Sequence, residues 1–549
     1  IGISEHFEFD VNLTSANDRV NTDYLYFSPA ADNLWDGQWG ILRAFDGNMD
    51  QNDQETGGLV RLPSNPKGFR IRTQASSSVC PQGAPKFLFD LTATLVKDLL
   101  TGDQQTLMYN QAFGIHDPNA IVIIQTKDRQ AIANGTKQLE PLILRARAGD
   151  CIKVKLNNEL PEQMPDHDSK DPSHWSWNMM SPSIDGFNFN QVRSSSRVSL
   201  HPQLVATFTH NTDGANVGKN NDSTVPGKPN PAAPTQNLQY EWYAGDLKYN
   251  DQGKLVPAPI EFGIVGLRDM GDVIKHSSHG AIGALVIEPE GAIIDSNTEH
   301  SHCGPDVGQE AAATICDKDG NFLFREFVLL YQDDVSLQWH GQPLPNLRNA
   351  DDSEDSGQKA FNYRTEPIWA RLGADPAADP EAMMELDWTD AFSSRVSHQS
   401  CEADPNHGTY CDPATPIFTA KAGQNVRFRV VHVAGKPRNH AFTLNGHDWT
   451  LTPWECEDPT NINVPHDPNK QSCDSTKLGW SKFASNRVGS VGGIGPGRHI
   501  NILTKAGGEY GIPGDYLYRT QEGFSFAGGL WGIFRVEPAT SSGEEVPKP

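Results

Sequence analysis

The sequence of 549 residues lacks long apolar runs, and it lacks the opening that is typical of a secretion signal. A transmembrane helix needs about 20 largely apolar residues in succession, and no stretch of the chain supplies them. No basic segment followed by an apolar segment begins the chain, so we expect a front end that is mature or trimmed. The sequence therefore predicts no membrane span.

Positive charge is also scarce. The chain has 45 Lys and Arg against 69 Asp and Glu, which gives a formal net charge of −24. Such a surface repels phosphate groups, so nucleic acid is excluded as an expected partner. A chain of this length is too long for a single hydrophobic core, and we expect about two to four domains.

The sequence has no Cys-x-x-Cys motif and therefore no compact zinc site of that kind. Its eight cysteines fall mostly into neighbouring pairs that bracket polar loops. The predicted disulfides are Cys303/Cys316, Cys401/Cys411, Cys456/Cys473 and, from the two cysteines that remain, Cys80/Cys151. Because disulfides persist in oxidising compartments, we expect an extracytoplasmic protein, whether periplasmic, cell-surface or secreted. The alternative is eight unrelated buried thiols.

Long helical periodicity is scarce as well. The chain has instead 49 glycines, 38 prolines and many short β-branched runs bounded by turn residues, such as "AIVIIQTKD" and "NVRFRVVHV". This pattern is typical of antiparallel sandwiches. The predicted fold class is therefore all-β.

Two kinds of internal repeat divide the chain. The segment 141–161, "PLILRARAGDCIKVKLNNELP", resembles 415–435, "TPIFTAKAGQNVRFRVVHVAG", and each reads as a strand, an Ala-Gly turn and a second strand. A closing pattern, Gly-x-x-Gly followed by a strand, occurs three times, beginning at Gly37, Gly280 and Gly529. Two openings and three closings imply two complete β-domains preceded by the tail of a third. The predicted organisation is an incomplete domain at 1–46, a linker at 47–80, a domain at 81–292, a linker with a disulfide loop at 293–321, a domain at 322–540 and a flexible tail at 541–549.

The first and last closings are near-copies of one another. Residues 23–43 read "DYLYFSPAADNLWDGQWGILR", and residues 514–536 read "GDYLYRTQEGFSFAGGLWGIFRV". Tyr-Leu-Tyr and Gly-x-Trp-Gly-Ile recur in both, whereas the residues between them differ. We interpret the recurring parts as two strands and a turn that a sandwich needs.

With these elements in this order, the chain resembles the multicopper oxidases, which are built from repeated cupredoxin sandwiches. The resemblance lies in the Ala-Gly turns, the Gly-x-x-Gly closings and "PRNHAFTLNGHDW" at 437–449. It covers most of the chain and is nearest to the large bacterial multi-domain members. The resemblance implies repeated cupredoxin-like Greek-key β-sandwiches.

The copper signatures of that family, His-Pro-x-His-x-His-Gly and His-Cys-His-x-x-x-His, are not found in the chain. Counted back from Gly529, the four ligand positions of the second signature hold Arg519, Thr520, Gln521 and Ser525. His440 stands where the resemblance places a histidine of the mononuclear site. A blue copper site needs a thiolate and two imidazoles, which these residues do not supply. No copper is therefore expected at the usual sites.

Three further histidines form a candidate residual metal site. His201 lies in "SLHPQLV", and His276 and His279 lie in "KHSSHG" at the end of the same predicted domain. The topology of the family would bring these loops together, which would let two or three imidazoles bind copper. The alternative is that they are structural histidines left from an ancestral site.

Other histidines are weaker candidates. His300 and His302 alternate in "EHSHC", but they lie beside a predicted disulfide loop. His440, and His6 as its counterpart in the incomplete domain, are predicted to be structural and hydrogen-bonded.

Residues 1–46 are too few for a cupredoxin sandwich, which needs about 100 residues. We expect a missing N-terminal region or a partner chain to complete them, because strand complementation is a known mode of recognition. A homo- or hetero-oligomer is left open.

The sequence supports two functions. The first is an exported multicopper-oxidase-like protein with degenerate copper sites, which serves as a structural or interaction part of a larger assembly. The alternative is a copper-dependent oxidase of metal ions or phenols, with its copper in missing upstream domains, in a partner chain or at residual histidines.

Overall fold

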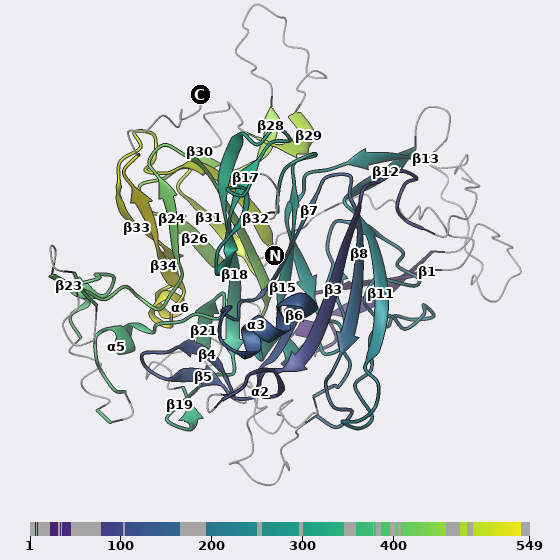
Figure 1. Cartoon of the computed structure of the whole chain (residues 1–549), viewed down its shortest axis with the longest axis horizontal. Coiled ribbons are helices and arrows are strands. Elements are labelled where there is room, and N and C mark those ends of the chain that lie inside the picture. Colours follow the sequence, from purple (N-terminus) through teal and green to yellow (C-terminus); the bar gives the residue numbers. More distant parts are fainter. Residues whose placement is uncertain are drawn as a thin grey trace, which may run out of the picture.

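The structure is a computed structural model that describes residues 22–44, 78–164, 194–249, 255–295, 300–344, 358–379, 386–395, 402–404, 408–435, 438–456, 473–479 and 487–539, apart from a few positions within them, together with residues 6 and 8. Its regular structure is mostly β-strand, so the predicted all-β class is confirmed (Figure 1). The main helices of the described residues are single turns: α2 (Val96–Leu99), α3 (Arg129–Ala133), α4 (Lys275–Ser278), α5 (Ile368–Arg371) and α6 (Gly523–Ala527). None of the described helices is long and apolar enough to cross a membrane.

The first sandwich consists of two mixed sheets. One sheet has the order β10-β11-β8-β3-β6, from β10 (Ala206–Thr207), β11 (Gln236–Tyr243), β8 (Cys151–Asn158), β3 (Lys86–Leu95) and β6 (Ile121–Gln125). The other has the order β7-β15-β14-β9, from β7 (Leu142–Arg147), β15 (Gly283–Glu288), β14 (Gly263–Arg268) and β9 (His201–Pro202). Alternation in β8 buries Ile152, Val154 and Leu156 while Lys153 and Lys155 face outward. The apolar residues of both sheets meet in one core cluster.

The second sandwich is built in the same way. Its first sheet has the order β16-β17-β18-β25-β32, from β16 (Gly304–Asp306), β17 (Gln309–Cys316), β18 (Phe322–Val335), β25 (Asn425–Ala434) and β32 (His499–Lys505), and β21 (Gln358–Phe361) also pairs with β18. Its second sheet has the order β24-β34-β33-β26-β31, from β24 (Ile417–Lys421), β34 (Trp531–Glu537), β33 (Gly514–Thr520), β26 (His440–Leu444) and β31 (Ser490–Ile494). Aromatic rings join the two sheets, with 4.8 Å between the ring centroids of Phe327 and Phe418.

The sequence repeat is a structural repeat. β3 pairs in parallel with β8 as β18 does with β25, and β7 pairs in parallel with β15 as β24 does with β34. The two Ala-Gly turns join equivalent strands. Gly149 and Gly423 have φ values of 87° and 81°, in the left-handed region that favours glycine.

The two sandwiches share apolar packing. One core cluster includes Ile264 and Val286 of the first sandwich together with Val328 and Val430 of the second. Figure 1 shows β7 and β15 beside β18, between the outer sheets of the two units. The segment 293–321, predicted as a linker, contains β16 and β17. Because β17 pairs with β18, and β16 with β17, the two strands extend that sheet. The remaining domain boundaries stay predictions.

The N-terminal near-copy forms an isolated hairpin of β1 (Thr22–Phe27) and β2 (Trp39–Ala44). Its register repeats that of β33 and β34, since Tyr26 lies opposite Gly40 as Tyr518 lies opposite Gly532. The ion pair of Arg43 with Asp23 likewise matches that of Arg535 with Asp515. In both hairpins the glycine gives room to the tyrosine ring, because an added Cβ would lie less than 3.0 Å from it.

Hydrogen bonds of Asp23 with Lys219 and Asn220 hold this hairpin to the first sandwich. The Asp23 carboxylate accepts hydrogen bonds from Arg43 and from the backbone N–H of Lys219, at 2.7 Å. The side-chain amide of Asn220 donates to the Asp23 carbonyl oxygen, also at 2.7 Å. Arg268 of β14 donates to the carbonyl oxygen of Pro29. Polar contacts thus position the hairpin both at its open end, through Asp23, and at the connection between its strands, through Pro29.

Two of the predicted disulfides are present. Cys80 bonds to Cys151 at the start of β8, and Cys303 bonds to Cys316 at the end of β17. Cys411 is also in a disulfide, whereas its predicted partner, residue 401, lies outside the described residues. The backbones of residues 456 and 473 lie directly opposite one another in the strand pair β28 (Trp454–Cys456) and β29 (Cys473–Leu478). The predicted disulfide between these two cysteines requires such a position.

Candidate metal centre

The three histidines of the predicted residual site lie in one sandwich. His201 begins β9, His276 lies in α4, and His279 follows that helix. His201 Nδ1 is 2.6 Å from the carbonyl oxygen of Asp213, and His279 Nδ1 is 2.8 Å from Asp117 Oδ2. Among the described residues, the potential ligand atoms of these three histidines do not all lie within 4.8 Å of one another. The structure does not bring them together, and copper at any of them stays a prediction.

His276 is occupied on both sides of its ring. Nδ1 donates to Asp269 Oδ2 and Nε2 donates to the carbonyl oxygen of Ser195, both at 2.7 Å. Burial by itself lowers the pKa of His276, but the charge and hydrogen bond of Asp269 raise it to about 9. Because an imidazolium has no lone pair for a metal, His276 acts as a structural cation below that pH.

The pair of His276 with Asp269 predicts a pH-dependent stability. The folded-state pKa of His276 lies above its ordinary value of 6.5, so this contribution to stability is complete below pH 6.5. It is lost as the pH rises from 6.5 through about 9. Urea unfolding across this range measures the change in unfolding free energy, and His276→Gln should flatten the slope. Equal slopes in the two proteins would contradict the assignment.

A different group of potential ligands does converge. Asp333 at the end of β18, His432 in β25 and His440 at the start of β26 each place one ligand atom within 4.8 Å of the others. Parallel pairing of β18 with β25 sets Tyr331 beside His432, two residues before Asp333. All three side chains of the group are buried. Sequence reasoning singled out His440 but missed the other two. The sequence feature that could have pointed to Asp333 and His432 is a polar residue inside each of the apolar runs "FVLLYQDDV" and "FRVVHV".

Asp333 is the charged centre of this group. Lys359 Nζ and Arg438 Nη1 both donate to its Oδ1, the latter at 3.2 Å, whereas Oδ2 lies 3.2 Å from His440 Nε2. Burial favours the neutral acid, but Lys359, His440 and Arg438 hold the pKa of Asp333 well below its ordinary value. The carboxylate is therefore anionic, and one of its oxygens faces the imidazole. The hydrogen bond to His440 agrees with the structural role expected of that histidine.

His432 differs from the other histidines of the cluster. It is fully buried, and neither ring nitrogen has a hydrogen-bond partner among the described residues. Burial, with the nearby charges of His440, Arg268 and Lys359, places its pKa well below the ordinary value, although Asp333 acts in the opposite direction. His432 is thus a neutral imidazole with an available lone pair, 5.2 Å from the ring centroid of His440.

Thr520 lies next to His440. Its hydroxyl oxygen is 3.4 Å from His440 Nδ1, and the hydroxyl donates to Glu522. A hydroxyl group therefore lies beside this imidazole. Arg519 turns away from the ring of His440, with its guanidinium 4.6 Å from the ring centroid of Phe526.

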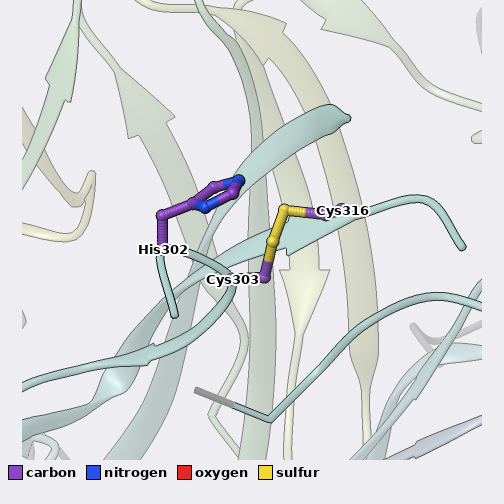
Figure 2. Close-up of side chains that lie close together, drawn as sticks. All are labelled: His302, Cys303 and Cys316. Carbon is purple, nitrogen blue, oxygen red and sulfur yellow. A yellow bond between two sulfur atoms is a disulfide. The ribbon is translucent and has the colours of Figure 1, made fainter. Parts of the chain in front are cut away.

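The other sulfur and histidine clusters among the described residues cannot bind a metal as they stand. Figure 2 shows His302 beside Cys303 and Cys316, whose sulfur atoms are joined in a disulfide. The same holds for Cys80, Cys151 and Glu241, because both cysteines are oxidised. A metal needs the thiolate form, which a disulfide does not offer.

Comparison with known proteins finds solved structures that are similar to this chain only at low sequence identity and low TM-score. No family model and no curated protein matches the chain. Among solved structures, a blue copper oxidase from Nitrosomonas europaea is 11% identical with a TM-score of 0.38, covering 82% of this chain and 86% of its own. A copper nitrite reductase from the same organism is 12% identical with a TM-score of 0.37, covering 84% and 99%. A multicopper oxidase is 11% identical with a TM-score of 0.36, covering 82% and 88%. At this identity and TM-score the likeness says nothing of this chain's activity.

Proposed function

We propose that the chain is a structural and interaction part of a larger exported assembly with multicopper-oxidase-like architecture, in which the usual copper sites are not formed. A further polypeptide segment completes the hairpin of β1 and β2, as an N-terminal region or as a partner chain. The disulfides support an oxidising compartment, and the charge of −24 gives no support to a nucleic-acid partner.

The observation that carries this proposal is the exposure of the hairpin. Tyr518 and Phe534 of the complete sandwich are fully buried, whereas their register counterparts Tyr26 and Leu42 are 63% and 42% exposed. In the complete unit, β34 also pairs with the parallel strand β24. Among the described residues, β2 pairs only with β1. A hairpin of this kind presents both an open edge and an open apolar face, which is the surface that strand addition uses.

The surroundings of His440 support the second half of the proposal. Thr520 takes the place of the thiolate, with its hydroxyl oxygen 3.4 Å from His440 Nδ1. A type 1 copper ion would therefore lack its soft ligand there. The alternative, a copper oxidase with its copper outside this chain, is an outcome that the following experiment separates.

Hydrogen exchange tests the hairpin. In the 549-residue chain produced alone, the outer-edge amides of 39–44 should exchange rapidly, because no second strand accepts their hydrogen bonds. In protein isolated from its source without denaturation, the same amides should be protected. The matched control is the peptide 531–537 of β34, which should exchange slowly in both samples.

The contrary results are specific. If 39–44 is already protected in the chain alone, the hairpin needs no partner. If the native material is a monomer of 60.3 kDa, no larger assembly exists. Stoichiometric copper in the native material, with an intense thiolate-to-copper band and oxygen-consuming oxidation of a phenol that the chain produced alone lacks, would favour the oxidase.

A further inference from the structure

Asp333, His432 and His440 offer a set of metal ligands different from that of a blue copper site. Asp333 and His432 come from β18 and β25, outside the two histidine signatures, and the set contains no sulfur. Two imidazoles and a carboxylate suit borderline divalent ions of the first transition row. The site lies within the second sandwich and is independent of the partner proposed above.

The geometry is close to that of a bound ion. Ligand atoms about 2.0–2.2 Å from a metal lie roughly 3–4 Å from one another. The three potential ligand atoms already lie within 4.8 Å, and His440 Nε2 and Asp333 Oδ2 are 3.2 Å apart. Small rotations of two rings would therefore close the site around an ion.

A second observation that supports a metal site is that neither ring nitrogen of His432 has a hydrogen-bond partner among the described residues. A buried polar group without a hydrogen bond costs about 1–3 kcal/mol, so such groups usually have a partner. The hydroxyl of Tyr331, whose ring centroid is 5.9 Å from that of His432, also has no partner among the described residues.

We propose that Asp333, His432 and His440 bind one divalent transition-metal ion of the Zn²⁺ class. Asp333 contributes Oδ2, because Lys359 and Arg438 hold Oδ1 and fix the orientation of the carboxylate. His440 exchanges its hydrogen bond with Asp333 for the metal. The ion gives His432 the partner that it lacks.

The nearby charges set the strength of binding. Lys359, Arg438 and Arg268 are cations close to the site, whereas Asp334 and Glu522 add negative charge to that of Asp333. Lys359 is buried and donates to the metal-binding carboxylate, so it opposes the ion most directly. Its removal should therefore tighten metal binding.

The test uses the full chain after dialysis against a chelator. Titration with Zn²⁺ in a calorimeter should show one site, and Co²⁺ should give the absorption spectrum of a four- or five-coordinate ion. His432→Gln and His440→Gln should each weaken Zn²⁺ binding at least 100-fold, and Lys359→Met should strengthen it at least tenfold. The matched control, His302→Gln beside the Cys303–Cys316 disulfide, should bind as the wild type does.

Two outcomes would overturn this site. One is the absence of saturable Zn²⁺ binding, which would leave a buried water as the partner of His432. The other is Zn²⁺ binding that is lost in His302→Gln but kept in His432→Gln. If the variants at the cluster fail to fold, X-ray absorption of the wild type with Zn²⁺ bound decides, because two imidazoles and one carboxylate must appear as ligands. Failure here leaves the exposed hairpin untouched, since that proposal rests on hydrogen exchange of 39–44.

Discussion

Replacement of Glu326 by alanine is expected to lower the free energy of unfolding by about 3–5 kcal/mol, the usual cost of removing one partner from a buried ion pair. Glu326 in β18 is fully buried and accepts from Arg145 Nε at 2.9 Å and from Arg429 Nε at 3.0 Å. Arg145 belongs to β7 of the first sandwich and Arg429 to β25 of the second. The substitution leaves two buried guanidinium groups poorly compensated at the contact between the sandwiches.

Glu288 of β15 completes this network. It accepts from Arg429 Nη2 at 3.1 Å, and burial beside Glu326 raises its pKa well above the ordinary value. Burial also opposes ionisation of Glu326, but the hydrogen bond from Glu288 and the charges of the two arginines lower its pKa to about 2. Of the two carboxyl groups, Glu326 is thus the more acidic and the one that pairs as an anion with the arginines. The anion carries the expected loss.

Urea unfolding of the wild type and of Glu326→Ala measures this effect. The control is Arg487→Ala, which removes an ion pair with Asp448 whose side chains are 46% and 47% exposed. Exposed pairs contribute about 1 kcal/mol or less, so this variant should unfold almost as the wild type does. A loss below about 1 kcal/mol for Glu326→Ala would show that the two sandwiches do not depend on the network.

Gly532→Ala and Gly40→Ala form a second test, in which the same local geometry should give unequal costs. At Gly532 an added methyl group would lie less than 3.0 Å from the Tyr518 ring and from the carbonyl oxygen of Pro416. Tyr518 is fully buried and donates to that carbonyl at 2.6 Å, so it has no room to move. Overpacking of this kind costs about 3 kcal/mol. At Gly40 the three atoms nearest to the methyl group all belong to the ring and hydroxyl of Tyr26, which is 63% exposed and can turn away.

Gly40→Ala should therefore change the unfolding free energy of the isolated chain by less than about 1 kcal/mol. In the completed assembly the same substitution should weaken partner binding, because Tyr26 would then be held as Tyr518 is. Thermal unfolding of both variants, alone and in the native complex, measures these differences. Equal costs in the isolated chain would mean that the face of Tyr26 is already covered.

Much of the fold could be predicted because its signals are local. Turn residues and β-branched runs predicted the strands, and two copies of an Ala-Gly turn predicted two sandwiches with the same connections. The spacing of Cys303 and Cys316 predicted their disulfide, because a short polar loop between two cysteines limits their choice of partner. The Tyr-Leu-Tyr near-copies predicted two strands and a turn in each copy, and in both hairpins the second tyrosine, Tyr26 or Tyr518, lies opposite a glycine.

The candidate metal centre could not be predicted in the same way. The histidine spacing in "KHSSHG" suggested His276 and His279 as ligands, yet neighbouring carboxylates hold both rings. His440 and Asp333 are 107 residues apart, and His432 meets them because two parallel strands align in a register that no local pattern encodes. The sequence by itself determined the strands, their repeat and two of the cysteine pairs, since turn chemistry and side-chain period act over a few residues. Only the tertiary structure decided which buried polar side chains meet, because that depends on pairing between distant strands and on the burial that follows from it.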